Sequence, residues 1–320
     1  DIFFNTLDIP KADYDLGVGS DTHARQTSKI MERFEEVVMK EKPDVIIVYG
    51  DTNTTIAGAL VGAKLKIPVA HIEAGLRQEP KDMPEEINRV VTDHLSSLLF
   101  APSMLAVGNL KNEGINRGVY FPGDVMYDLF LLAKEKIMHE EDTNKTLNVG
   151  FDKFALFTLH RDFNTDIEER LISILKAVGM IAQEIKVIFP IHPRTRKCIT
   201  NFKLEYLLDS IHCIEPIDYL TTIKLLNKCE FVITDSGGLQ KEAYFAEKRA
   251  IVLMPDTGWR ELTDCRWNIL ADIDGEKIFK GFKQITKETI IPPSGLYGDG
   301  DAGSKIAKIL LGKNQKSWRN

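Results

Sequence analysis

Two stretches, Val48-Tyr-Gly-Asp-Thr-Asn-Thr54 and His71-Ile-Glu-Ala-Gly-Leu-Arg77, decide the fold class of this chain. In each of them an apolar run ends at an acid with a glycine close by: the acid is Asp51 in the first stretch and Glu73 in the second. Open parallel sheets bind their ligands at the carboxyl ends of the strands. The two acids therefore predict a polar site at one edge of a parallel sheet.

The rest of the chain alternates short apolar runs with longer amphipathic segments, which is typical of repeated βα units. The strands are expected at 45–49, 68–72, 98–101, 118–121, 154–158, 187–190, 211–214, 231–234 and 250–253. In the first half, helices are expected at 54–65, 84–97 and 104–112, and a short helix at 304–311 closes the pattern. The pattern predicts an α/β protein of two Rossmann-like, doubly wound domains that face each other across a central cleft.

Size and composition agree with a soluble two-domain enzyme. The chain has 320 residues, of which 43% are hydrophobic and 28% charged. The net charge of -6 argues against a nucleic-acid partner. No apolar run approaches the roughly 18 residues of a membrane span. Four cysteines without a C-x-x-C spacing favour a reducing, cytoplasmic compartment, and the histidine spacing supports no metal site.

Domain limits follow from the polar stretch at 139–145, which is the expected linker. The first domain is predicted to comprise residues 1–128 and 303–320, and the second residues 129–302. A nucleotide-binding domain ordinarily begins with a strand and a glycine-rich turn, and neither precedes the strand at 45–49. The chain is therefore expected to lack an N-terminal piece.

The segment Thr234-Asp-Ser-Gly-Gly-Leu-Gln-Lys-Glu-Ala243 carries the strongest phosphate signal. A strand ends, Gly237 and Gly238 allow close approach to the backbone, and a helix begins whose exposed N–H groups can bind an anion. Pyrophosphate would rest on Ser236 and Gly237, while Glu242 would accept hydrogen bonds from a ribose. The alternative is a plain capped turn, with Asp235 or Ser236 as the N-cap.

Two histidines follow neighbouring predicted strands of the same domain. His160 comes directly after the strand at 154–158, and His192 after the strand at 187–190. A histidine at such a place can be a general acid or base, or a phosphate ligand. The alternative for each residue alone is an ordinary polar loop position.

In the first domain the predicted reactive set is Asp51, Glu73, Glu85 and Arg89. Crowded carboxylates raise one another's pKa, so that one site can hold both a proton donor and a base at neutral pH. Two simpler interpretations remain open. Glu85 and Arg89 are four residues apart and could pair on one helix face, and Asp51 could serve only as a helix cap.

The chain resembles the non-hydrolysing UDP-N-acetylglucosamine 2-epimerases, a family with the two-domain GT-B architecture. The segments that carry the resemblance are Gly50-Asp-Thr52, His71–Arg77, Pro84–Arg89, His160-Arg161, Asp235–Glu242 and Tyr297-Gly-Asp-Gly300. The segments Asp1–Pro10 and Ile191–Lys197 are more similar to the subgroup that acts on UDP-2,3-diacetamido-2,3-dideoxyuronic acids.

This resemblance implies inversion at C2 of a UDP-linked 2-acetamido sugar, of the UDP-GlcNAc to UDP-ManNAc type. UDP would be eliminated anti to give a glycal and then added back, and the product would serve the synthesis of cell-surface polysaccharide precursors. The substrate is the only small molecule implied: neither a metal nor NAD is expected. A homodimer is the implied assembly.

The resemblance also assigns residues. Asp51, Glu73 and Glu85 match the catalytic acids, with His160 beside them in the active site. Ser236, Gly237 and Glu242 match the UDP-binding positions, Arg89 matches an active-site position, and the segment at 215–219 matches the loop that flanks the uracil. His192 and Gly238 join the predicted substrate-binding set because of their places after strands.

Three features depart from the family pattern. The N-terminal Gly-Thr-Arg-Pro turn is absent, Asp162-Phe163 replaces an arginine and a glutamate, and the segment Val252–Trp259 lacks the usual arginine and glutamates. Two alternatives therefore stay open: a GT-B glycosyltransferase that uses a UDP-sugar, and a non-catalytic protein that binds UDP-sugars.

Overall fold

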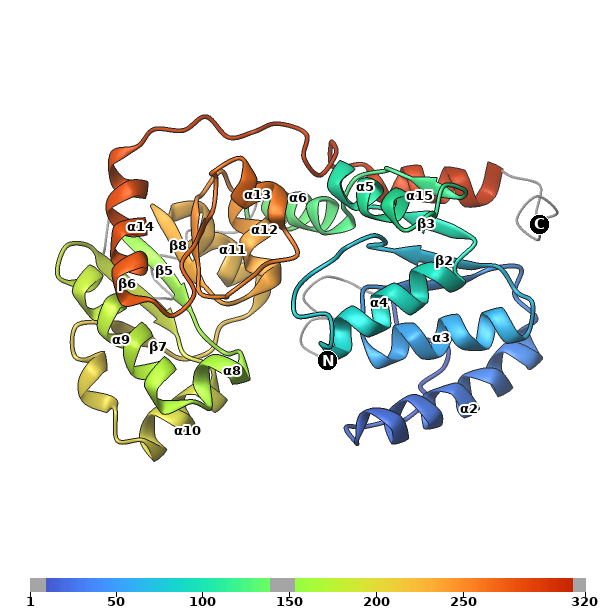
Figure 1. Ribbon diagram of the computed structural model, residues 1–320, viewed down its shortest axis with the longest axis horizontal. Coiled ribbons are helices and arrows are strands. Elements are labelled where there is room, and N and C mark those ends of the chain that lie inside the picture. Colours follow the sequence, from blue (N-terminus) through green and yellow to red (C-terminus); the bar gives the residue numbers. More distant parts are fainter. Residues whose placement is uncertain (1–9, 139–152, 313–320) are drawn as a thin grey trace. The chain divides into compact units, whose positions relative to one another are not determined.

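The computed structural model describes residues 10–138 and 153–312, and its elements form two compact units (Figure 1). One unit comprises residues 10–128 and 295–312, and the other residues 129–138 and 153–294. The expected linker at 139–145 lies outside the described residues. The functional domain limits predicted from the sequence, 128/129 and 302/303, stay a prediction.

The first unit contains a four-stranded parallel sheet, drawn in blue to green in Figure 1. Its strands are β1 (Ile46–Tyr49), β2 (Val69–Ile72), β3 (Leu98–Phe100) and β4 (Val119–Tyr120), in that spatial order. Its helices are α2 (His23–Glu41), α3 (Asn53–Lys64), α4 (Pro84–Leu95), α5 (Met104–Asn112) and the red α15 (Ala302–Gly312). Helix α15 belongs here because its Ile306 packs with Ala70 and Phe100 of the sheet.

Helix α4 shows why the sequence begins a helix at this place. Pro84 occupies its first turn, where the fixed φ suits a helix and no N–H is needed. Glu85 and Glu86 follow in the same turn, where the macrodipole favours acids. The first turn of α4 is therefore both a strong helix start and a source of carboxylates.

The second unit contains a six-stranded parallel sheet in the order β10-β9-β8-β5-β6-β7. Its strands are β5 (Phe154–Thr158), β6 (Lys186–Pro190), β7 (His212–Ile214), β8 (Phe231–Thr234), β9 (Ala250–Val252) and β10 (Ile269–Leu270). Its helices are α6 (Val125–Met138, which begins in the first unit), α8 (Asp162–Thr165), α9 (Glu168–Ala182), α10 (Pro193–Asn201), α11 (Tyr219–Lys228), α12 (Gly237–Phe245), α13 (Arg260–Asp264), α14 (Gly275–Lys287) and the 3-10 turn Glu205–Leu208.

The chain reverses its direction of travel across this sheet between β5 and β8. From β5 it proceeds outward through β6 to β7, and from β8 it proceeds the other way to β9 and β10. Such a switch point opens a crevice beyond the carboxyl ends of the two strands, and that is where doubly wound sheets bind ligands. A ligand-binding site is therefore expected at the loops that follow β5 and β8.

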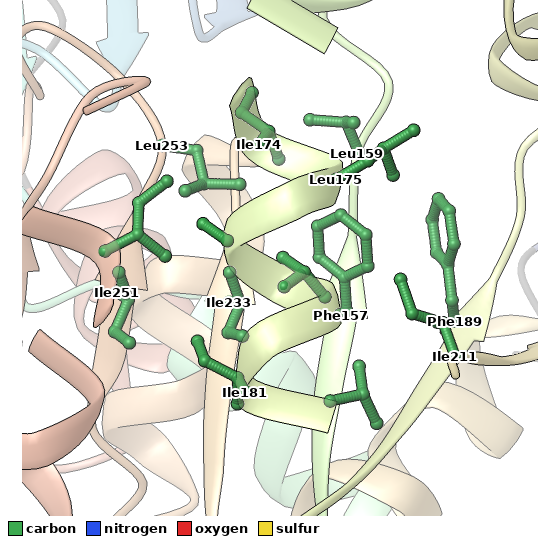
Figure 2. Packing of buried hydrophobic residues seen from close by; sticks show 14 of the residues in the cluster. Phe157, Leu159, Ile174, Leu175, Ile181, Phe189, Ile211, Ile233, Ile251 and Leu253 are labelled. Carbon is green, nitrogen blue, oxygen red and sulfur yellow. The ribbon is translucent and has the colours of Figure 1, made fainter. Parts of the chain in front are cut away.

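One hydrophobic cluster of the second unit joins its sheet to α9. Phe157 of β5 and Phe189 of β6 stack with ring centroids 4.3 Å apart, and both are fully buried. Figure 2 shows Ile174, Leu175 and Ile181 of α9 packed against the same face. Each large apolar side chain buried in this way contributes roughly 1.5–3 kcal/mol. This packing holds β5 and β8 rigidly, and with them their carboxyl ends.

The predicted fold class, α/β with parallel sheets, is confirmed. All nine predicted strands are present, with ends that differ by a residue or two. Strand β10 was not predicted, because two residues are too few to show an alternation of apolar and polar side chains. In the described part of the chain, no helix is both long enough and apolar enough to cross a membrane.

Candidate active site

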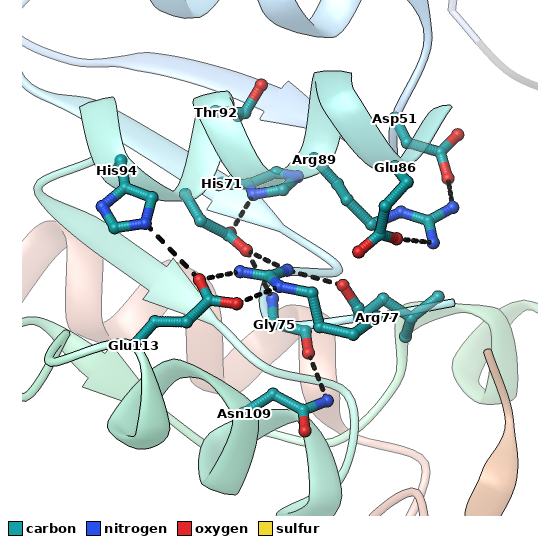
Figure 3. Close-up of polar contacts among 12 residues, drawn as sticks. Asp51, His71, Gly75, Arg77, Glu86, Arg89, Thr92, His94, Asn109 and Glu113 are labelled. Atoms are coloured by element: carbon teal, nitrogen blue, oxygen red, sulfur yellow. Dashed lines mark hydrogen bonds and ion pairs between the residues drawn. The ribbon is translucent and has the colours of Figure 1, made fainter. Parts of the chain in front are cut away.

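At the carboxyl ends of β1 and β2, an arginine joins two acids (Figure 3). The guanidinium of Arg89, only 4% exposed, donates to the carboxylate of Asp51 and, over 2.8 Å, to Oε2 of Glu86. The side chain of Asn88, the preceding residue on α4, donates to the backbone carbonyl of Asp51 over 2.9 Å. Helix α4 therefore fixes both the backbone and the carboxylate of Asp51.

The simpler pairing of Glu85 with Arg89 is wrong. Arg89 pairs with Glu86, one residue further on, which is buried, whereas Glu85 is only half-buried. Burial raises the pKa of Glu86, and Arg89 and the N–H of Gln78 only partly offset this rise. Spacing permitted either acid, but the rotation of α4 against the sheet decided which one faces inward.

Asp51 does not cap α3. The N-cap is Thr52, whose N–H donates to Oγ1 of Thr55 over 3.1 Å. Asp51 therefore has no local structural role in this helix, and its carboxylate is directed to Arg89. The capping interpretation of Asp51 is wrong.

Glu73 follows β2 in an unusual backbone conformation. Its φ is 75°, in the left-handed region that residues other than glycine seldom adopt. The N–H groups of Glu73 and Ala74 both donate to the carbonyl of Phe100 at 3.1 Å, which ties this turn to β3. Backbone strain held by surrounding bonds is concentrated at functional sites, so it supports the prediction that Glu73 acts on a ligand.

A buried ionic chain that the sequence did not predict lies behind these acids. His71, fully buried on β2, has Nδ1 2.7 Å from Oδ1 of Asp93 on α4 and Nε2 2.7 Å from the carbonyl oxygen of Gly50. Oδ2 of Asp93 accepts from Arg77 over 2.8 Å, and Arg77 forms two 2.6 Å hydrogen bonds with Glu113. The available signal was a histidine and an aspartate inside otherwise apolar strand and helix faces.

The charges along this chain support one another. Arg77 lowers the pKa of Glu113 by hydrogen bonding, against an opposing effect of burial. Burial disfavours the charge of Arg77, but its bonds to Glu113 and the charge of Asp93 outweigh it and raise its pKa. Both groups are therefore charged at neutral pH.

In the second unit, Asp235 organises the switch point between β5 and β8. This fully buried carboxylate accepts from the backbone N–H groups of His160 at 3.1 Å and of Arg161 at 2.9 Å. It also accepts from Nδ2 of Asn164 at 3.2 Å and lies 3.2 Å from Nδ1 of His160. Sequence reasoning considered Asp235 only as a possible helix cap, yet its role is to hold the loop after β5.

Helix α12 begins at this point with two glycines, which carry no side chains of their own. Ser236 is the N-cap, because its Oγ accepts from the N–H of Leu239 over 3.3 Å. A Cβ added to Gly237 would lie 3.7 Å from Nε1 of Trp259 and 3.9 Å from Nη2 of Arg161. A cationic guanidinium beside a helix N-terminus forms a strong anion site.

Glu242 lies further along α12 and is 8% exposed. Burial raises its pKa, and Tyr219 and Lys241 act in the opposite direction. The pKa of Tyr219 is itself raised by burial and then by the charge of Glu242. The Lys241 ammonium lies 3.7 Å from the ring centroid of Trp259. The Glu242 carboxylate is thus largely dehydrated.

His192 lies near His160, as their positions after adjacent strands predict. Their ring centroids are 6.4 Å apart, and Nδ1 of His192 accepts from the N–H of Arg194 over 3.2 Å, which caps α10. Beside His192, a cavity of about 390 Å³ is lined by Ile191, Pro193, Arg196, Glu215 and Pro216, among others. The carboxyl ends of β5, β6 and β8 therefore present one continuous set of polar groups.

Most of the residues predicted for each unit lie at or near the carboxyl ends of its strands. Asp51, Glu73 and Arg89 lie at the carboxyl ends of β1 and β2 or on α4, and His160, His192, Ser236 and Gly237 follow β5, β6 and β8. Within the ranges 10–138 and 153–312, no group of three or more His, Cys, Asp or Glu residues is arranged to hold a metal ion. The catalytic and binding roles of these residues stay predictions.

Comparison with known proteins places this geometry in a family. The model of the UDP-N-acetylglucosamine 2-epimerase family matches residues 1–311. A UDP-N-acetylglucosamine 2-epimerase homolog of Methanococcus maripaludis is 45% identical, over 97% of this chain and 87% of its own. The UDP-2,3-diacetamido-2,3-dideoxy-D-glucuronate 2-epimerase of Pseudomonas aeruginosa is 42% identical, over 97% of this chain and 86% of its own.

Comparison with solved structures indicates the same family. The crystal structure of the Methanocaldococcus jannaschii UDP-GlcNAc 2-epimerase in complex with UDP-GlcNAc and UDP matches with a TM-score of 0.90 and 40% identity. The match covers 98% of this chain and 88% of that one. With the parallel sheets, the strand-end acids and the glycine start of α12 in place, these matches show that the chain belongs to the UDP-N-acetylglucosamine 2-epimerase family.

Proposed function

We propose that this enzyme inverts C2 of a UDP-linked 2-acetamido sugar, of the UDP-GlcNAc to UDP-ManNAc type. The observation that carries the proposal is the placement of Asp51 and Glu73 at neighbouring strand ends, with Arg89 bonded to Asp51. Relatives of this chain carry the matching names, and one solved relative holds UDP-GlcNAc and UDP.

The reaction we propose is an elimination followed by an addition. The C1–O bond breaks and UDP leaves with the electron pair, while a carboxylate takes the C2 proton to give a 2-acetamidoglycal. UDP then adds back to C1, and a proton is delivered to the other face of C2. Because no carbonyl is conjugated to C2, its proton is not acidic, so cleavage at C1 must lead. Carboxylates stabilise the positive charge that develops there.

The two units divide this work. On the second unit, the N-terminus of α12 with Ser236, Gly237 and Gly238 would hold the diphosphate, and Glu242 would accept from the ribose. The cavity bordered by Glu215 and Pro216 suits the uracil. On the first unit, Asp51, Glu73 and Glu85 would act at C1 and C2. His160 and His192 would contact phosphate or assist proton transfer.

Solvent deuterium tests this proposal. Turnover of UDP-GlcNAc in heavy water should place deuterium at C2 of the product, because the proton removed from C2 exchanges with solvent before it is returned. NMR detects both the new C2 epimer and the label. Product formed with full protium retention at C2 would falsify the elimination mechanism, and UDP release that strictly requires an acceptor would indicate a glycosyltransferase.

The physiological sugar is a separate point. We propose UDP-GlcNAc, as a precursor for cell-surface polysaccharide, and the diacetamido uronate as the competing substrate because of the 42% identical Pseudomonas relative. Parallel assays with the two UDP-sugars decide by the ratio of their kcat/KM values. Light scattering of the purified chain tests the proposed homodimer, which should have twice the 36.2 kDa of one chain.

A further inference from the structure

His71 lies between the two loops that carry the strand-end acids of the first unit (Figure 3). It belongs to β2 and is fully buried, so water does not reach its ring. One ring nitrogen is 2.7 Å from the carbonyl oxygen of Gly50, the residue before Asp51. The other is 2.7 Å from Oδ1 of Asp93. Both distances are those of strong hydrogen bonds.

The chemistry of the two partners determines which atoms carry protons. A backbone carbonyl can only accept a hydrogen bond, so Nε2 of His71 must carry a hydrogen. A carboxylate also only accepts, and Oδ2 of Asp93 already accepts from Arg77 at 2.8 Å and from the N–H of Gly75 at 3.0 Å. Nδ1 of His71 must then carry a hydrogen as well.

We propose that His71 carries a hydrogen on both ring nitrogens and through them positions the two catalytic loops. Its Nε2–H holds the Gly50 carbonyl and thereby the Asp51 loop. Its Nδ1–H holds Asp93, and Asp93 in turn holds the N–H of Gly75 at the end of the Glu73 loop. His71 is a positioning residue and not a catalytic one, and this role rests on the function proposed above.

The surrounding charges make such a buried cation tolerable. Along the chain His71, Asp93, Arg77 and Glu113, cations and anions alternate, so that each buried charge has an opposite neighbour. At its outer end Nε2 of His94, half exposed, lies 3.4 Å from Glu113. A neutral His71 would leave either the Gly50 carbonyl or the Asp93 carboxylate without its donor.

The Glu73 loop is held on two sides, by α5 and by Asp93. Gly75 has a φ of 84°, and a Cβ there would come within 2.4 Å of the carbonyl oxygen of Ala106 on α5. The carbonyl of Gly75 also accepts from Nδ2 of Asn109 at 2.9 Å. The loop is therefore clamped between α5 on one side and Asp93 on the other. Loss of the His71–Asp93 bond would relax the second clamp.

The protonation state can be read on the native enzyme. The chain has seven histidines, and ¹⁵N-histidine labelling gives a long-range ¹H–¹⁵N correlation pattern for each ring. The pattern that is absent from His71→Gln identifies His71. We expect both of its nitrogens to show protonated shifts at neutral pH, because each is assigned a hydrogen bond that it donates. A bare ring nitrogen at neutral pH would overturn the proposal.

Two amide variants separate the two bonds. His71→Gln places an amide N–H near Nε2 and keeps the bond to Gly50, whereas His71→Asn places one near Nδ1 and keeps the bond to Asp93. We expect each to lower kcat by roughly tenfold to a hundredfold, because small displacements of reacting groups are costly. UDP affinity, measured by calorimetry, should stay within about twofold, since UDP is assigned to the second unit.

His94→Gln is the matched control, because it changes an exposed histidine at the outer end of the same ionic chain and should keep kcat within about twofold. Wild-type kcat in both folded amide variants would refute the positioning role. If the variants do not fold, the native spectrum still decides, because the absence of any ring with both nitrogens protonated at neutral pH would refute the proposal. If the native enzyme turns over no UDP-sugar, the proposed function fails. The spectrum does not depend on turnover, so it still reports whether both ring nitrogens of His71 are protonated.

Discussion

At the carboxyl ends of β1 and β2, charged side chains hold one another in place, whereas at those of β5 and β8 one buried carboxylate holds backbone amides. Arg89 bridges Asp51 and Glu86 in the first case. In the second, Asp235 binds the N–H groups of His160 and Arg161, and the start of α12 beside it is formed by glycines. Side-chain charges can gain and lose protons, while backbone dipoles cannot. The first arrangement suits a reaction centre and the second suits a fixed anion.

The largest effect should come from Asp51→Asn, which removes a carboxylate from the carboxyl ends of β1 and β2. Turnover of UDP-GlcNAc should fall by about a hundredfold or more, because an acid–base group is lost. UDP affinity, measured by calorimetry, should hardly change. Asp44→Asn, at the exposed opposite end of the same strand, is the control. Equal losses of turnover and UDP affinity would mean that the two sheet edges do not divide the work.

The second effect concerns how much Asp235 stabilises the loop after β5, whose backbone amides it binds. Asp235→Asn replaces a carboxylate that accepts several N–H groups with an amide that can accept on one atom only. The free energy of unfolding should fall by roughly 2–3 kcal/mol, since buried hydrogen bonds to a charged group are lost. Urea denaturation measures this. Asp166→Asn, at an exposed ion pair, should leave the midpoint unchanged; a similar shift there would remove Asp235 from its special role.

Third, Glu242→Ala tests nucleotide binding directly. UDP affinity should weaken by roughly 1–3 kcal/mol, because hydrogen bonds to a charged group disappear. Glu247→Ala changes an exposed acid just beyond α12 and serves as the control. Calorimetry with UDP compares the two variants. An unchanged affinity in Glu242→Ala would exclude this carboxylate from the binding site.

The smallest effect should be that of Glu113→Gln, at the partly exposed end of the ionic chain. Arg77 lowers the pKa of Glu113 in the folded state, so this group stabilises the fold above its ordinary pKa of 4.5, and the contribution is lost as the pH falls through the lowered value. At pH 7 the variant should lose about 0.5–1 kcal/mol, reduced by solvent screening.

Urea midpoints at several pH values measure this difference, with Glu276→Gln, a largely exposed acid, as the control. The gap between native protein and the Glu113 variant should close towards pH 3. A gap that stays constant across this range would show that the effect does not depend on the charge of Glu113.

The positions of Asp51, Glu73, His160 and Ser236 could be predicted because each directly follows an apolar run. A parallel strand that ends in a polar residue determines where that residue lies, whatever packs around it. The family resemblance, the α/β class and the epimerase class are likewise confirmed. The assignment of catalytic and binding roles to these residues remains a prediction.

The hydrogen-bond and ion-pair partners of the site residues could not be predicted from the sequence. Whether Glu85 or Glu86 meets Arg89 depends on how α4 is rotated against the sheet, which many distributed contacts determine. His71 and Asp93 are 22 residues apart and meet only once β2 and α4 have packed. Asp235 was read with the helix that follows it, although its bonds go to the loop after β5. Local patterns carry no information about such pairings.

Strand β1 has a consequence for how the protein behaves in concentrated solution. In the part of the chain that the structure describes, β1 pairs only with β2, and its Ile47 and Tyr49 side chains are 38% and 62% exposed. An edge strand that exposes apolar side chains can associate with another strand. Samples should therefore aggregate through this edge as the protein concentration rises. The charge introduced by Ile47→Lys should reduce this aggregation.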